Sequence, residues 1–287
     1  MPSPTVYAPS NVTLGGLSLS ARDPVTGVEI VTEDVGGWGS PAATGESTQK
    51  PRGHGGWSGE SFLRPRSITL TGYIYADDPS VLSTGVDTLI AACSLGLTTL
   101  AVSENGRTRT CQVRRQDEPL FNWVSANHAE WSLQLIADDP RKYGSTVGVS
   151  TPLASTTGGF TLPFTLPLAI TATTATGLLS ITNTGNIKSP ITLRIDGPVQ
   201  GPAVTHIFGS EVTVWASSAT VVAGNWLTVV MDDDKRYVLE NDQASRNDTV
   251  TQRGWFFLEP GVNQFVFTAN AYNSSALLTV TTDSAWM

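Results

Sequence analysis

The chain has 287 residues, of which 40% are hydrophobic and only 15% are charged, and its formal net charge is −8. This length suggests two domains that can each bury a core. The charge is −4 on either side of a division after Ser145 (11 basic against 15 acidic residues, then 6 against 10), which argues against a dedicated nucleic-acid-binding protein.

Targeting and redox signals are also weak. The first residues lack the basic and apolar regions of a signal peptide, and no apolar run is suited to crossing a membrane. Cys93 and Cys111 make no disulfide framework. We expect a protein made in the cytoplasm, without membrane insertion and with two buried thiols.

Glycine dominates the sequence from Gly36 to Gly59, after about 35 residues that are expected to form short strands. This glycine density is incompatible with a helix or a central strand. Loops of this length are usually functional or disordered. Trp38 and Trp57 favour order, because indole rings need a surface to pack on. We interpret the segment as a long ordered loop or flap.

A strand and a helix follow the flap. Ser67–Tyr75 alternates between apolar and polar residues, which predicts a strand. Asp78 is placed to cap a helix that has Pro79 at its first position. Apolar residues at helical spacing continue this helix, which we place at Pro79–Leu95, and it is the only convincing helix in the sequence.

A β-hairpin is predicted after the helix. Thr98–Ser103 and Arg107–Arg115 flank a turn that contains Asn105-Gly106, a strong hairpin signal. Glu130–Ala137 alternates as a further strand. The first domain therefore combines strands with one helix.

The domain boundary is expected near residue 150. Residues 145–160 have the composition of a linker, and we assign residues 1–148 and 149–287 to the two domains. Two prolines in Thr161–Pro167 predict an extended arm. The second domain is expected to be a β-sandwich, because short strands recur about every ten residues. These strands are Ile191–Ile195, Val204–Phe208, Val212–Trp215, Trp226–Met231, Arg236–Leu239, Trp255–Leu258, Gln264–Phe267 and Leu277–Thr281.

No catalytic motif is recognisable. His54, His128 and His206 lie far apart, without a Cys or His at metal-ligand spacing. Nucleophile elbows, phosphate loops and dinucleotide fingerprints are absent from the sequence. Distant residues could still meet in the fold. We nevertheless expect neither enzymatic activity nor a cofactor.

The acidic clusters have structural explanations. Asp232-Asp233-Asp234 could ligate calcium, but its place between two predicted strands favours a polar turn. Asp77-Asp78 and Asp138-Asp139 could form a carboxylate pair for glycoside hydrolysis. Asp78 is better explained as the helix cap, and Asp139 precedes a proline turn. We expect no metal site.

The aromatic residues are the strongest candidates for an interaction surface, because Trp is enriched at interaction hot spots. Core packing is the default for Trp215, Trp226 and Trp255 on predicted strands. For Trp38 and Trp57 on the glycine-rich loop, core and interface roles remain equally open. The candidate subunit-interface residues are Trp38, Trp57, Phe62, Pro163 and Phe164.

Several stretches, in their order and spacing, resemble the distal tail proteins, or minor tail proteins, of siphophages, especially those that infect actinobacteria. The stretches are the Gly-Gly-Trp-Gly and Gly-Gly-Trp-Ser-Gly loops, Ile68–Tyr75 before the Asp-Pro helix start, Leu133–Pro140, Ile181–Gly185, Ser189-Pro190, Ile195–Pro198, Trp255–Asn263 and Ala285–Met287.

The resemblance implies a belt domain, a β-sandwich with a flanking helix akin to tail-tube subunits, and a galectin-like or carbohydrate-module-like sandwich outside it. It implies a homo-hexameric ring at the distal end of the virion tail, between the tail tube protein and the tail-tip hub protein. The tape-measure protein is a further candidate partner. DNA would pass without specific binding, and the acidic balance fits such a conduit, because basic surfaces hold phosphates strongly. The resemblance supplies no catalytic residues.

Two alternatives remain open. The second domain could recognise cell-wall carbohydrate of the host, which varies within the family. A tail-associated glycosidase would require two facing carboxylates in a cleft.

Overall fold

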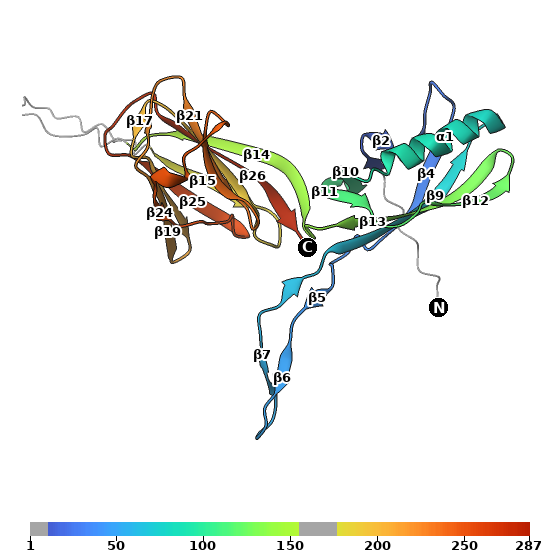
Figure 1. Cartoon of the computed structure of the whole chain (residues 1–287), viewed down its shortest axis with the longest axis horizontal. Helices are drawn as coiled ribbons and strands as arrows, with labels where there is room; N and C mark the ends of the chain where they lie inside the picture. Colours follow the sequence, from blue (N-terminus) through green and yellow to red (C-terminus); the bar gives the residue numbers. More distant parts are fainter. Residues whose placement is uncertain (1–10, 155–176) are drawn as a thin grey trace, which may run out of the picture. The chain divides into compact units, whose positions relative to one another are not determined.

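The computed structural model describes residues 11–154 and 177–287, and it is mainly β with one α-helix in this part of the chain (Figure 1). Two compact units are formed. The first contains Met1–Gly144 with Trp286–Met287, and the second contains Ser145–Ala285. The predicted fold class is confirmed. The Thr161–Pro167 arm, with the interface candidates Pro163 and Phe164, lies outside the described residues.

The first unit is built around β9 (Arg66–Tyr75), which pairs with β4 (Glu29–Gly36) and β13 (His128–Ala137) on its two sides. β3 (Ser20–Arg22) continues the sheet beyond β4, and β12 (Leu120–Ser125) continues it beyond β13. Gly72 permits the close pairing of β4, because a Cβ atom there would lie 1.9 Å from a carbonyl oxygen of that strand.

The predicted hairpin belongs to the same hydrogen-bonded sheet, which it joins where Arg114 and Arg115 pair with Ile136 and Leu135 of β13. β10 (Thr98–Glu104) and β11 (Arg107–Arg115) pair around Asn105 and Gly106, whose φ angles are 50° and 74°. Positive φ at both central residues is the requirement of a type I′ turn. β1 (Asn11–Leu14) pairs with β10, and β2 (Leu17–Ser18) pairs with β1.

Helix α1 (Pro79–Ala92) begins as predicted. The Asp78 side chain accepts a hydrogen bond from the Ser80 backbone N–H at 2.7 Å. The helix ends before the predicted Leu95, because Cys93 leaves the helical conformation as its C-cap and the carbonyl of Ser94 accepts a hydrogen bond from Arg115 instead.

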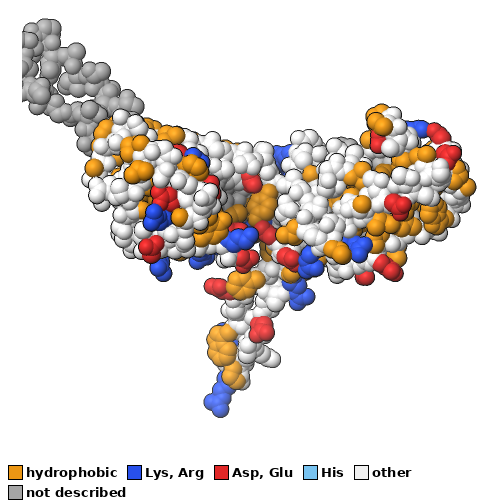
Figure 2. Space-filling model, turned by 45° about the horizontal axis from the view of Figure 1, so that its top comes forward, with side chains coloured by type: hydrophobic (Ala, Val, Ile, Leu, Met, Phe, Trp, Pro, Cys, Tyr) orange, Lys and Arg blue, Asp and Glu red, His pale blue; other side chains and the backbone are white. Residues whose placement is uncertain are grey.

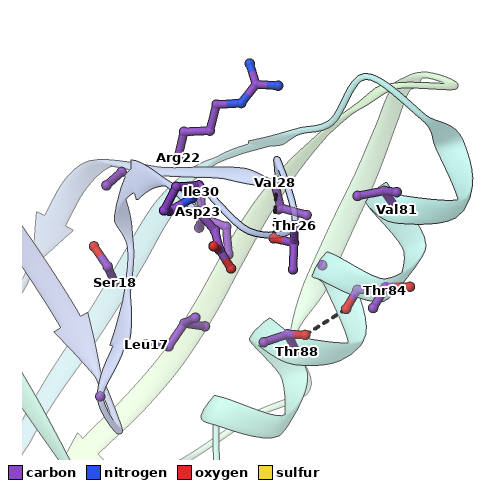
Figure 3. A pocket seen from close by; sticks show the side chains of 14 residues that line it. Leu17, Ser18, Arg22, Asp23, Thr26, Val28, Ile30, Val81, Thr84 and Thr88 are labelled. Carbon is purple, nitrogen blue, oxygen red and sulfur yellow. Dashed lines mark hydrogen bonds between the residues drawn. The ribbon is translucent and has the colours of Figure 1, made fainter.

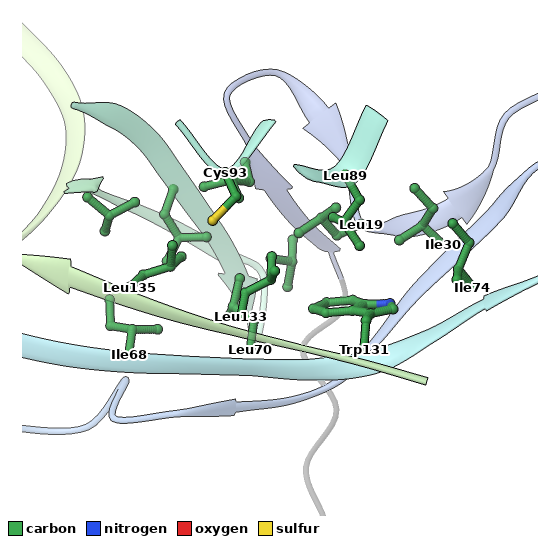
Figure 4. Packing of buried hydrophobic residues seen from close by; sticks show 14 of the residues in the cluster. Leu19, Ile30, Ile68, Leu70, Ile74, Leu89, Cys93, Trp131, Leu133 and Leu135 are labelled. Carbon is green, nitrogen blue, oxygen red and sulfur yellow. The ribbon is translucent and has the colours of Figure 1, made fainter. Parts of the chain in front are cut away.

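The core of the first unit lies between α1 and the strands (Figure 4). Side chains that alternate inward from β9 and β13 meet those of the helix, and they include Ile68, Leu70, Ile74, Leu89, Cys93, Trp131, Leu133 and Leu135. Cys93 and Cys111 are both buried as free thiols, and burial raises the pKa of Cys111 to about 12.

The glycine-rich flap is a two-stranded ribbon, which we call the hairpin arm (residues 40–65). β5 (Ala43–Thr44) pairs with β8 (Phe62–Leu63), and β6 (Ser47–Gln49) pairs with β7 (Gly56–Ser58). Figure 1 shows this arm reaching out from the first unit. The sequence predicts an ordered loop here, because the two short ladders are too brief to give a periodic pattern.

The second unit consists of two antiparallel sheets around a core that contains Trp215, Phe265 and Phe267. One sheet has the order β23-β22-β21-β16-β26-β14, and the other has the order β15-β25-β18-β19-β24. The strands are β14 (Lys142–Pro152), β15 (Leu178–Asn183), β16 (Ile191–Asp196), β18 (Ala203–Phe208), β19 (Glu211–Ser217), β21 (Trp226–Met231), β22 (Arg236–Glu240), β23 (Ala244–Ser245), β24 (Val250–Arg253), β25 (Gly261–Thr268) and β26 (Leu277–Trp286), with β17 (Val199–Gln200) paired to β20 (Thr220–Val221).

Two sequence predictions are wrong here. The predicted linker at 145–160 is a strand as far as Pro152, so the chain passes from one unit to the other within β14, and residues 155–160 lie outside the described part. Ser and Thr in this stretch serve as strand residues. Trp255–Leu258 has alternating burial but forms no strand, because only Leu258 makes a backbone bridge, to Ser189. Asp232–Asp234 forms the expected turn between β21 and β22.

Candidate subunit interface

The hairpin arm carries two large apolar side chains in solvent. Trp57 on β7 is 58% exposed, and Phe62 on β8 is 66% exposed. Both are interface candidates in the sequence. Exposed aromatic side chains on a projecting element are typical of contact surfaces, because their burial against a partner gives a large gain in free energy.

The tip of the arm is basic although the protein is acidic. Lys50, Arg52 and His54 lie between β6 and β7, and residues 47–59 contain no Asp or Glu. Figure 2 shows hydrophobic and basic side chains gathered along the outer part of the arm. The arm tip therefore suits a partner surface that is both apolar and acidic.

The root of the arm is fixed by two buried cations. Arg66, only 1% exposed, donates from Nε to the Pro140 carbonyl at 2.9 Å and from Nη1 to the carbonyls of Gly37 (3.0 Å) and Gly39. Lys142 Nζ donates to the Trp38 carbonyl at 2.7 Å. Burial, together with the nearby charges of Arg66 and Arg109, lowers the pKa of Lys142 to about 8. These contacts set the direction in which the arm leaves the unit.

Trp38 belongs to this root and to the core. Its side chain is 5% exposed and packs in the core of the first unit, and Lys142 Nζ lies 5.3 Å from the centre of its ring. Trp38 is therefore placed to hold the arm, whereas Trp57 and Phe62 are exposed to solvent.

A second exposed apolar group, which no sequence pattern predicts, lies on strand β12. Leu120, Trp123 and Val124 are each more than half exposed. Within the described part of the chain β12 pairs only with β13, so its other edge is open. An open, apolar edge strand favours association with another chain. The alternation in Leu120–Ser125 is weak, and a bulge after Trp123 explains why adjacent residues are exposed.

An apolar cleft of about 540 Å³ lies between α1 and the β2–β4 region of the first unit (Figure 3). Leu17, Val28, Ile30 and Val81 contribute its apolar lining. Gly85 allows helix α1 to lie close to the turn between β3 and β4, because a Cβ atom at Gly85 would lie 2.8 Å from a methyl group of Val28. The cleft also went unrecognised in the sequence, because its walls come from segments about 60 residues apart.

The acidic pairs considered for hydrolysis have other partners. Asp77 is ion-paired with Arg22, and Asp78 caps α1. Asp138 contacts Arg114 at 3.2 Å, and Asp139 contacts Arg141 at 2.9 Å. In residues 11–154 and 177–287, no group of three or more His, Cys, Asp or Glu residues is placed to hold a metal ion. Among the described helices, none has the length and apolarity needed to span a bilayer.

Comparison with solved structures defines the class of fold. The sequence matches no family model and no curated protein. The chain is nevertheless similar to a phage tail component over nearly its whole length, and its fold is that of the distal tail (Dit) proteins.

One similar structure is the Dit protein of phage SPP1, with a TM-score of 0.68 and 14% identity over 96% of this chain and 99% of that chain. That protein is described as a paradigm of the hub of the adsorption apparatus in phages that infect Gram-positive bacteria. A chain of the phage p2 baseplate in its activated conformation with Sr is also similar, with a TM-score of 0.51 and 10% identity over 94% of this chain and 96% of that chain.

Proposed function

We propose that this chain is a structural subunit of a siphophage tail tip. The observation that carries the proposal is the agreement with SPP1 Dit over almost the full length of both chains, which covers both units and their order. The proposed location is the distal end of the tail in the virion, and the proposed neighbours are the tail tube protein and the tail-tip hub protein.

We further propose that six identical subunits form a closed ring. The exposed apolar side chains of the arm and of β12 support it, because two different surfaces on one subunit can join copies head to tail, and such contacts form a ring where the rotation between copies closes. The ring would serve as a non-enzymatic conduit for DNA. A net charge of −8 on each copy is suited to that role, because an acidic lumen does not retain phosphates.

The test of ring formation is mass measurement in solution together with negative-stain imaging of the purified full chain. The proposal predicts particles of six copies with sixfold symmetry. A protein that stays monomeric at high concentration, and also on addition of the tail tube protein, would contradict it.

A depression on the second unit favours recognition of cell-wall carbohydrate as a second candidate function. It has a volume of about 260 Å³ and is lined by Arg236, Asn247, Val250, Arg253 and Trp255. An indole beside guanidinium and amide donors is a combination suited to stacking on a sugar ring and bonding its hydroxyls. Glycan-array binding that is lost in Trp255→Ala would support this function, and an array without any bound glycan would remove it.

A further inference from the structure

We infer that the arm tip of one copy, with Trp57 at its centre, occupies the apolar cleft beside α1 of the next copy. The inference rests on the proposed ring and names the contact that closes it. It joins an exposed apolar projection to an apolar recess, both of which lie on the first unit.

The Trp57 side chain and the cleft beside α1 match in apolar character and in size. The cleft has a volume of about 540 Å³, within the range of pockets that enclose a drug-sized group. In Figure 3 the side chains of Leu17, Val28 and Val81 lie around the opening between the β2–β4 region and helix α1, whereas Arg22 points away from it. An indole in this recess would lose its contact with water, as would the recess itself.

The charges match as well. Asp23 lines the cleft, and hydrogen bonds from Val25 and Thr26 lower the pKa of its carboxyl, so it remains ionised at neutral pH. Asp87 is exposed on α1, one residue before Thr88 in the cleft wall. Helix α1 has no basic residue, and Arg22, the basic residue of the cleft lining, is ion-paired with Asp77. Lys50 and Arg52 of the arm tip would therefore meet acidic groups around the cleft.

The arm cannot occupy the cleft of its own chain. Figure 1 shows the arm leaving the first unit on the side of the sheet away from α1. Its root is held to Gly37, Trp38 and Gly39 by the buried Arg66 and Lys142, and folding back would break these contacts. A second copy of the chain is therefore the occupant. The contact joins two different surfaces, as a ring requires.

A charge exchange tests the contact in the full chain. Sedimentation velocity over a concentration series gives the assembly constant of the wild type, of an arm variant (Lys50→Glu with Arg52→Glu) and of a cleft variant (Asp23→Lys with Asp87→Lys). Each variant should weaken assembly at least about tenfold, because like charges then face each other. The chain that carries all four substitutions should regain most of the loss, since every contact in it again pairs opposite charges.

Trp57→Ala tests the apolar part of the contact. Loss of a buried Trp at the centre of an interface should weaken assembly about thirtyfold or more. Tyr272→Ala is the matched control, because Tyr272 is 59% exposed on the second unit and should leave assembly unchanged. Circular dichroism verifies that each variant is folded.

The outcomes separate this inference from the proposed ring. Rings that persist in Trp57→Ala and in both charge variants would overturn the inference and leave the proposed function intact. A deletion of residues 2–10 that abolishes assembly while Trp57→Ala does not would assign the cleft to the N-terminal segment and also overturn it.

If the wild type never assembles, the proposed ring fails, and a labelled peptide of residues 46–60 is then titrated into the full chain. Binding that is lost in the cleft variant would support the inference without the ring, and absence of binding would overturn it.

Discussion

Replacing Lys142 by methionine should remove a distinct pH dependence from the stability of the first unit. The Lys142 side chain is buried, with 5% exposure of the residue, and its Nζ donates to the Trp38 carbonyl at 2.7 Å. Burial, with a smaller contribution from the charges of Arg66 and Arg109, lowers its pKa from 10.5 to about 8. The folded state therefore disfavours the protonated amine.

The sign of the effect follows from proton binding. Between pH 8 and 10.5 the unfolded chain holds a proton on Lys142 that the folded chain has lost, so the free energy of unfolding rises with pH in this window. The pKa values of Lys142 in the unfolded and folded chains, 10.5 and about 8, imply that the free energy of unfolding rises by about 1 kcal/mol between pH 8 and pH 9. Cys111 acts in the opposite direction above its ordinary pKa of 9.0, because its folded pKa is about 12, so pH 8–9 is the clearest interval.

The assay compares urea denaturation of the wild type and Lys142→Met at pH 8 and at pH 9. Pulse labelling of Cys93 and Cys111 with a thiol reagent reports the first unit alone, because both thiols are buried in its core. Between the two pH values, the free energy of unfolding of the wild type should rise by about 1 kcal/mol more than that of the variant. An equal change in both proteins would refute the assigned proton linkage.

Three further predictions concern single side chains. Trp38→Ala should lower the free energy of unfolding by about 3–5 kcal/mol, whereas Trp57→Ala should leave it within about 0.5 kcal/mol, as measured by urea denaturation of each variant. Gly72→Ala should prevent close pairing of β4 with β9 and cost more than about 3 kcal/mol, while Gly39→Ala, which meets no atom within 4 Å, should be nearly neutral in thermal denaturation. Burial lowers the pKa of His206, so acidification through pH 6.5 should destabilise the second unit, and this loss should be absent from His206→Phe in urea titrations at pH 7 and 5.

Local signals allowed much of the fold to be predicted from the sequence. Asp78 and Pro79 determine the start of α1 because a cap needs only neighbouring residues. Asn105-Gly106 determines its hairpin for the same reason, since the turn requires positive φ at both positions. Alternation over ten residues likewise located the strand that became β9.

The remaining features depend on contacts between distant residues. Trp38 and Trp57 occupy similar glycine-rich sequences, yet only Trp38 is buried, because Lys142 and Arg66 reach it and its neighbours from far along the chain. The cleft beside α1 likewise depends on tertiary packing. The composition of residues 145–160 predicts a linker, although β14 extends to Pro152, because Ser, Thr and Gly occur in both linkers and strands. The partner strand that decides between them is distant in the sequence.

The position of the chain in the virion tests the central claim most directly. Gold-labelled antibodies against the second unit, applied to intact phage particles that encode this chain, can be located by electron microscopy. The tail-tip assignment predicts label at the distal end of the tail, beyond the tail tube. Label confined to the head or spread along the tube would contradict it.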